Sequence, residues 1–224
     1  DAHTHLSTVG RYEVHADLSG TESRAEALDC LTARAGDIAA DDWLLGYGYD
    51  ESSWGETEPL VAADLAALDH PGPVAAFRED LHLVSVDETA LAQVVEDSTS
   101  GGGDDGVLVE AGATAVRRRL QPDRVEARRL LEAGQRRAVS RGVTGVHDLV
   151  RRSAAPRAYR DMAHEGDLDL RVQIYYWRDH VDAVAEVGLR TGGNGRVEFG
   201  GIKTFSDGSL GARSARLADP YADA

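Results

Sequence analysis

Lysine is almost absent from this chain of 224 residues. Its 24 cationic side chains include one lysine, Lys203, and therefore 24 − 1 = 23 arginines. Arginine keeps its proton, whereas a buried lysine can lose its proton and expose a nucleophilic amine. That amine can add carbon dioxide and become a carbamate, an anionic oxygen donor for a divalent cation. The position of Lys203 therefore indicates either chemistry that arginine cannot perform or the chance placement of a rare residue.

Cysteine is equally scarce, and long apolar runs are absent. The single cysteine, Cys30, excludes an internal disulfide and suits a reducing compartment, so we expect a cytoplasmic protein. No apolar run approaches the roughly 20 residues that a membrane-spanning helix needs. The sequence opens at Asp1 in the middle of a motif, which leaves open whether a removed signal peptide precedes it.

Positive charge is outnumbered. The 24 cations face 39 carboxylates, and the formal net charge is −15. Such a field repels phosphate backbones and anionic lipids, so the charge argues against nucleic-acid and membrane partners. Excess carboxylates with so little lysine are typical of proteins from salt-loving organisms, although a GC-rich genome also favours arginine. The composition, 42% hydrophobic and 28% charged, is that of a globular domain with a core.

The first six residues, DAHTHL, contain two histidines at strand spacing. On an extended strand, His3 and His5 point to one face while Ala2 and Thr4 face away. Two imidazoles on one face can bind one metal, and Asp1 offers a carboxylate nearby. With eight histidines in the chain, such a pair arises by chance roughly 0.3 times, so the motif alone is weak.

Residues 21–121 show their own alternation of elements. A capping box at Ser23 and Glu26 predicts a helix through Ile38, and further helices are predicted after Pro59 and after Asp87. Strands are predicted at 43–49 and 74–77. The GGGDDG segment at 101–106 predicts a loop, and the lack of a following lysine excludes a Walker phosphate loop.

After residue 121 the pattern becomes regular. A helix from Asp123 is followed by predicted strands at 143–149 and 170–176 and by the Lys203 strand, with helices at 156–166 and 181–189. Strand starts lie about 27 to 29 residues apart, close to the roughly 30 of a βαβ unit. The sequence therefore predicts an α/β fold, a partial (β/α)8 TIM barrel of about four βα units. Its parts are strand 1 and a loop at 1–20, a large inserted α/β subdomain at 21–121, and units 2–4 at 122–224.

Catalytic groups of a parallel barrel collect at the carboxyl ends of its strands. Lys203 lies near such an end, before a glycine-rich loop, and His147 and Asp148 end another strand. A lone His-Asp pair is more often a packing element, and a tryptophan in a loop is more often simply packed. With these alternatives open, the residues proposed for a substrate pocket are Asp50, Trp54, His82, His147 and Asp207.

Together these segments resemble the amidohydrolase superfamily, most closely the family 3 branch that includes N-substituted formamide deformylases. DAHTHL is similar to its strand-one motif, WLLGYGYDESSW to its insertion motif, GVTGVHDL to strand two, and GGIKTFSDGSLGARSA to its strand-four lysine segment. The resemblance implies His3 and His5 as ligands of a divalent metal, zinc, with one or two ions, and Lys203 as a carboxylated ligand. It also implies two further histidines and a general-base aspartate on strands five, six and eight. We expect those outside residues 1–224, so no catalytic residue is assigned here and the fragment alone should be inactive.

The resulting hypothesis is a fragment of a hydrolase that cleaves carbon–nitrogen bonds other than peptide bonds, in a small amide-like substrate, through a metal-activated water. One alternative is a metal-dependent phosphoesterase with an HxH barrel strand. Such enzymes lack the strand-four lysine, so a carbamate distinguishes the two. The other alternative is a non-catalytic half-barrel module that pairs with itself as a homo-oligomer, which the oligomeric state in high salt would test.

Overall fold

The chain forms two compact units in the computed structural model, which describes residues 1–55, 57–95, 105–151, 154–193, 195–208, 215–218 and 221. Residues 1–5 and 138–224 make one unit, here called the parallel-sheet unit. Residues 6–137 make the other, the mixed-sheet unit. Among the described helices, none combines the length and the apolar character needed to cross a bilayer.

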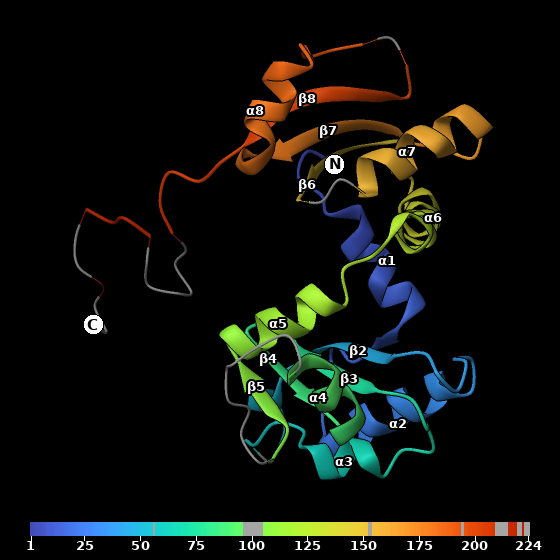
Figure 1. The fold of residues 1–224 in the computed structure, drawn as a ribbon, viewed down its shortest axis with the longest axis vertical. Helices are drawn as coiled ribbons and strands as arrows, with labels where there is room; N and C mark the ends of the chain where they lie inside the picture. Colours follow the sequence, from blue (N-terminus) through green and yellow to red (C-terminus); the bar gives the residue numbers. More distant parts are fainter. Residues whose placement is uncertain are drawn as a thin grey trace. The chain divides into compact units, whose positions relative to one another are not determined.

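The parallel-sheet unit contains three parallel strands in chain order, β6 (Gly145–Val150), β7 (Arg171–Trp177) and β8 (Val197–Lys203). Helix α7 (Ala154–Glu165) connects β6 to β7. The short η2 (Arg178–His180) and α8 (Val181–Glu186) lie between β7 and β8 (Figure 1). These strands and helices follow the predicted βα rhythm, since parallel neighbours need a crossover connection.

Residues 1–4 extend this sheet on the far side of β6. Thr4 forms a parallel bridge with Asp148. Its N–H donates to the carbonyl of His147 at 2.9 Å, and its carbonyl accepts from Leu149 at 3.0 Å. The predicted strand is shorter than expected because α1 (Leu6–Val14) begins directly after His5. The order from residues 1–4 to β8 is that of four successive parallel strands, and closure into a barrel stays a prediction.

The two faces of the parallel sheet differ in burial. Val146, Val172 and Ile174 are buried on the face that α7 covers. On the same face the hydroxyl of Tyr159 in α7 donates to Oδ2 of the buried Asp148 at 2.6 Å. The opposite side, here called the open face, carries mainly half-buried and exposed side chains, with Leu149 as a buried one. Helix α7 therefore covers one face of the sheet at β6 and leaves the open face uncovered by this helix.

The mixed-sheet unit has five strands in chain order: β1 (Ala16–Asp17), β2 (Leu44–Tyr49), β3 (Val74–Arg78), β4 (Leu83–Val86) and β5 (Val107–Val109). The first three are parallel, and β4 and β5 run antiparallel to their neighbours. Strands β2 and β3 lie where the sequence predicts them. Strands β4 and β5 were not predicted, because three or four residues are too few for a visible alternation.

Helices lie on both faces of this sheet: α2 (Arg24–Ala35), α3 (Ala62–Ala66), α4 (Glu88–Val95) and α5 (Ala111–Arg119). Two hydrophobic clusters result, and the neighbouring residues Leu44 and Leu45 of β2 point into different ones. All six residues of β2 are buried. A strand buried on both faces is typical of the centre of an α/β sheet.

The predicted helix caps are formed. The Ser23 side chain accepts from the N–H of Glu26, Asp87 accepts from Ala90 at 2.9 Å, and Asp123 accepts from Glu126 at 2.9 Å. The first of these helices is shorter than predicted, because α2 ends at Ala35. Four residues of the predicted glycine loop, 101–104, lie outside the described residues.

Helices α1 and α6 (Arg124–Ser140) pack closely in the mixed-sheet unit. A Cβ on Gly10 would lie 1.9 Å from the carbonyl oxygen of Leu130, and one on Gly134 would lie 2.4 Å from that of Leu6. This contact explains why the unit includes residues 6–20 and 122–137, although the sequence predicts an insertion limited to 21–121. The helices that flank the predicted insertion are packed against each other.

Replacement of Gly10 by alanine is expected to destabilise the protein by about 1–3 kcal/mol, since the new methyl group overlaps a backbone carbonyl that cannot move freely. Gly36→Ala is the matched control, because no atom lies within 4 Å of its added Cβ. Urea unfolding of both variants measures the difference. Equal midpoints for the two would contradict the close helix contact.

His15 is a buried titratable group in the same unit. Burial lowers its pKa to about 4, with the charges of Arg129, Arg11 and Arg34 acting in the same direction. Its ring packs 5.6 Å from that of Tyr47. The native state therefore keeps this imidazole neutral under conditions in which an unfolded histidine takes up a proton.

The free energy of unfolding is accordingly expected to fall as the pH falls from about 6.5, the ordinary histidine pKa, to about 4. In this pH range His15 takes up a proton in the unfolded chain but stays neutral in the native state, so unfolding becomes more favourable as the pH falls. A His15→Gln variant should show a slope shallower by up to about one proton in urea unfolding measured across this range. An unchanged slope would show that His15 titrates normally.

Candidate functional site

His3 and His5 lie on the open face, as the strand spacing predicts. Both are exposed, whereas Thr4 between them is buried. Their ring centroids are 5.6 Å apart, in an edge-to-face arrangement. The backbone N–H of His3 donates a hydrogen bond to Oδ1 of Asp1 at 3.0 Å. Extended backbone alternation thus places two imidazoles side by side.

The tautomer of His5 is set by a backbone carbonyl. Its Nδ1 lies 2.9 Å from the carbonyl oxygen of Leu149 in β6. Because the carbonyl can only accept, Nδ1 carries the proton and donates. Nε2 then carries the lone pair, which is the arrangement that metal-binding histidines adopt.

Lys203 is the last residue of β8 and reaches the same face. It pairs with Trp177, and one step back Gly201 pairs with Tyr175. In turn Tyr175 pairs with Leu149 of β6. Paired residues on neighbouring strands point to the same side of a sheet. Lys203 therefore lies on the same open face as the two histidines. Its ammonium nitrogen lies 4.6 Å from the centre of the Phe205 ring.

A β-bulge in β8 sets the direction of Lys203. Phe199 pairs with the buried Ile174, and the next pair is Tyr175 with Gly201, so Gly200 is an extra residue. If β8 ran on without the bulge, Gly200 would lie opposite Tyr175, and Lys203 would move one position along the strand and face the opposite side of the sheet. The Tyr175 ring lies across both glycines, because a Cβ on Gly200 would be 2.4 Å from its Cε2.

The other residues predicted for this end are placed differently. His147 is on the open face, and its ring packs 5.4 Å from that of Tyr175. Asp207 is exposed beyond β8, where hydrogen bonds from the N–H of Arg216 and the hydroxyl of Ser206 lower its pKa. Residues 209–214 of the predicted lysine segment lie outside the described residues.

Three predicted pocket residues belong to the mixed-sheet unit. Trp54 is 4% exposed, packs on Tyr49 and donates its indole N–H to the Thr21 carbonyl at 3.0 Å. It therefore has the packing role that was the alternative for this tryptophan. A contribution of Trp54 to a substrate pocket stays a prediction.

Asp50 and His82 have polar partners instead. Hydrogen bonds from Ser52 lower the pKa of Asp50, which caps η1 (Glu51–Ser53) and lines a shallow hollow of about 350 Å³ beside Arg78. His82 lies 3.2 Å from the Glu110 carboxylate, and both side chains are exposed. Their roles in substrate binding stay predictions.

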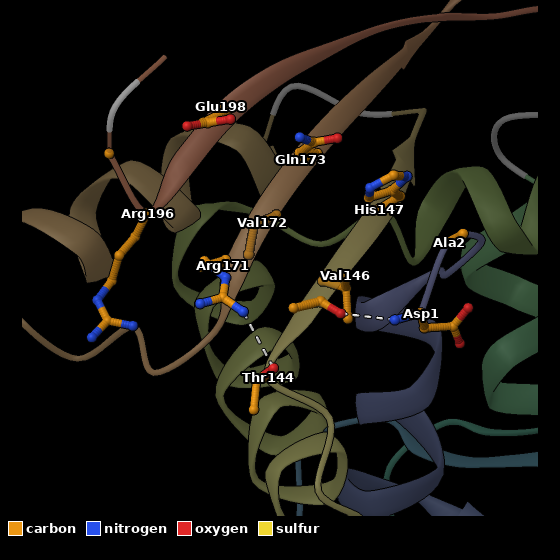
Figure 2. Close-up of a pocket in the computed structure, with 12 residues that line it drawn as sticks. Asp1, Ala2, Thr144, Val146, His147, Arg171, Val172, Gln173, Arg196 and Glu198 are labelled. Carbon is orange, nitrogen blue, oxygen red and sulfur yellow. Dashed lines mark hydrogen bonds between the residues drawn. The ribbon is translucent and has the colours of Figure 1, made fainter. Parts of the chain in front are cut away.

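One cavity lies at the amino ends of the parallel strands. Its volume is about 420 Å³, and His147 is the one predicted site residue that lines it. Figure 2 shows His147, Gln173 and Glu198 next to one another across the sheet. Arg171 lies lower in the same cavity, where it donates to the hydroxyl of Thr144 at 3.4 Å. No motif signals these lining residues, because they are isolated polar positions in otherwise apolar strands.

The candidate metal donors in the parallel-sheet unit are two histidines and one lysine. Across the part of the chain that the structure describes, no three His, Cys, Asp or Glu side chains gather around one point. His3 and His5 supply two donors, and the third candidate, Lys203, is not a ligand until its amine is modified. The structure thus brings these three to one face but does not complete a ligand set.

A sequence model of the amidohydrolase family matches residues 1–224, the whole chain. This chain belongs to the amidohydrolase family. The match confirms the resemblance read from DAHTHL and the Lys203 segment. The roles of His3, His5 and Lys203 as metal ligands stay predictions.

Two relatives align with the full length of this chain. It is 28% identical over 243 residues to the putative amidohydrolase YtcJ of Bacillus subtilis and 25% identical over 248 residues to the protein LONG AFTER FAR-RED 3 of Arabidopsis thaliana. All of this chain is covered in both, against 45% and 42% of those proteins. The chain therefore spans less than half the length of these relatives.

Two solved structures have the same fold. Both are uncharacterized metal-dependent hydrolases, one from Pyrococcus horikoshii OT3 and one from Pyrococcus furiosus. Their TM-scores are 0.81 and 0.78, at 26% and 25% identity. They cover 100% and 99% of this chain, which matches 45% and 46% of theirs. The predicted α/β fold class is confirmed at this level.

Gly200→Ala should destabilise the parallel-sheet unit by about 1–3 kcal/mol, because its methyl group overlaps the Tyr175 ring. Adding Tyr175→Ala removes the obstacle, so the double variant should lose less than the sum of the two single losses. Urea unfolding of the three variants gives the coupling energy. Additive losses would show that the ring does not rest on the glycine bulge.

Proposed function

We propose that the intact protein is a metal-dependent hydrolase of carbon–nitrogen bonds other than peptide bonds. The ligands from this chain are His3, His5 and the carbamate of Lys203. Family membership and the printed description of two similar structures as metal-dependent hydrolases support the hydrolase class. The choice of carbon–nitrogen bonds, of zinc and of a carbamate goes beyond those comparisons and is our inference.

One observation carries this proposal. The parallel register puts His3, His5 and Lys203 on the same face, the two histidines beside β6 and the lysine at the carboxyl end of β8. Carboxyl ends of parallel strands are where barrel enzymes of this kind assemble their sites. The only lysine of the chain therefore stands on the face that presents the two imidazoles.

The residues fit a divalent ion. His5 donates through Nδ1 to Leu149 and keeps Nε2 for a ligand bond. As an ammonium, Lys203 would repel a cation, whereas its carbamate is an anionic oxygen donor. A bound divalent ion would lower the pKa of a water molecule toward 7 and polarise the substrate carbonyl.

The chain's own residues prepare these donors. The hydrogen bonds of Thr4 to β6 hold the histidine pair against the sheet, and the glycine bulge turns Lys203 to the same side. We infer that further ligands and the general base come from sequence beyond this chain, which corresponds to less than half of its relatives. Proton transfer by an aspartate would be supplied there.

Lys203→Arg should abolish metal binding and hydrolysis in the intact protein, since arginine keeps the charge but cannot form a carbamate. Lys203→Ala leaves room for a small carboxylic acid, so added formate or acetate should partly restore activity. Bound metal is measured by elemental analysis and turnover with an N-acyl amine. Normal metal content in Lys203→Arg would overturn the assignment of this ligand.

The carbamate has a direct spectroscopic test. Lys203 is the only lysine of this chain, so intact protein equilibrated with ¹³C-bicarbonate should give a side-chain carbamate signal that Lys203→Arg lacks. The His3→Ala variant serves as a metal-site control that retains the lysine. A metal-loaded protein without this signal would favour a metal-dependent phosphoesterase, which uses an HxH strand without a modified lysine.

A further inference from the structure

We propose that Arg151 and Trp177 form an anion-binding site that receives a carboxylate of the substrate. The inference rests on the proposed function and narrows its substrate to amides that carry a carboxylate group near the scissile carbon–nitrogen bond. It assigns substrate selection to two residues that no sequence motif indicates.

The position of the pair is the first argument. Trp177 ends β7 and is the lateral partner of Lys203. Val150 pairs with Tyr176 as the last residue of β6, so Arg151 follows at the same end of the sheet. Both residues therefore lie at the carboxyl edge, one strand and two strands away from Lys203. A group bound there would be next to the proposed reaction centre.

The geometry of the pair is the second argument. The guanidinium carbon of Arg151 lies 3.8 Å from the centre of the Trp177 ring. Phe205 packs on the same indole, with ring centroids 5.2 Å apart. Nε2 of His180 lies 2.9 Å from the carbonyl oxygen of Arg151. A stacked guanidinium keeps its N–H donors in one plane, which suits two-point recognition of a carboxylate.

The indole N–H is the third argument. Nε1 of Trp177 is buried, and no described atom accepts its hydrogen bond. A buried N–H without an acceptor is costly and calls for an explanation, and a bound group that completes the pairing is one. A carboxylate beside Arg151 would supply the acceptor, so the same anion satisfies two donors.

The negative charge of the whole chain is consistent with a local cationic site for an anionic substrate. With a formal net charge of −15, this chain tends to repel anions. An anionic substrate therefore needs a fixed cation at the point of binding. The guanidinium stacked on Trp177 provides this cation, and unlike the Lys203 amine it is not converted to an anion by carbon dioxide.

The test compares two amides of similar shape, N-acetylglycine and the neutral N-propylacetamide, as substrates of the intact, metal-loaded protein. Arg151→Gln should lower kcat/KM for N-acetylglycine by about 10- to 100-fold and change that for N-propylacetamide less than about twofold. Arg151→Lys, which keeps the charge without the flat stack, should fall between wild type and Arg151→Gln. Arg141→Gln removes an exposed charge from the same unit and is the matched control.

A second readout does not need turnover. The chain has three tryptophans, and the indole ¹H–¹⁵N signal of Trp177 is identified by its loss in Trp177→Phe. N-acetylglycine should shift this signal in the wild type and not in Arg151→Gln, and N-propylacetamide should leave it in place. If no variant hydrolyses any amide, the proposed function fails, and this titration still decides the anion site.

Two results would overturn the anion site. Equal losses of kcat/KM for both amides in Arg151→Gln would assign the stack a structural role only. An indole signal that N-acetylglycine does not move would remove Trp177 from the binding site.

Discussion

Three amide hydrogen bonds between residues 1–4 and β6 hold the candidate site together, and the terminal amino group of Asp1 adds one to the Gly145 carbonyl. They join Asp1 to His147, and Thr4 to His147 and Leu149. Because the buried side chain of Thr4 faces the sheet interior, the imidazoles on either side of it must face out. The contact between His5 and the Leu149 carbonyl depends on the same alignment. Local backbone pairing thus fixes both the position and the tautomer of a ligand.

The position of a residue along its strand also decides whether its side chain reaches the site. Alternation puts every second residue on the open face, and a single extra residue reverses that assignment. The bulge at Gly200 and Gly201 provides this extra residue ahead of Lys203, and the Tyr175 ring covers it. Behind the sheet, the Tyr159 hydroxyl holds the buried Asp148. The open face is therefore set from both sides of the sheet.

Sequence patterns were sufficient where the signal is local. Capping residues, the βα rhythm and the histidine spacing predicted α6, β6, β7 and β8 and the shared face of His3 and His5. They could not predict the β8 bulge, because pairing with Tyr175 depends on a neighbouring strand. Nor could they predict the packing of Gly10 on Leu130, which enlarges the mixed-sheet unit, or the stack of Arg151 on Trp177, which joins residues 26 positions apart.

The glycine bulge has a consequence for changes in chain length. Deleting Gly200 would convert the bulge into a regular ladder while Gly201 stayed opposite Tyr175 and Lys203 opposite Trp177. A deletion or insertion of one residue between Gly201 and Lys203 would instead rotate the lysine to the helix-covered side. Natural length variation in this family should therefore be tolerated before Gly201 and excluded after it, so the alignment of the lysine must be anchored on the second glycine.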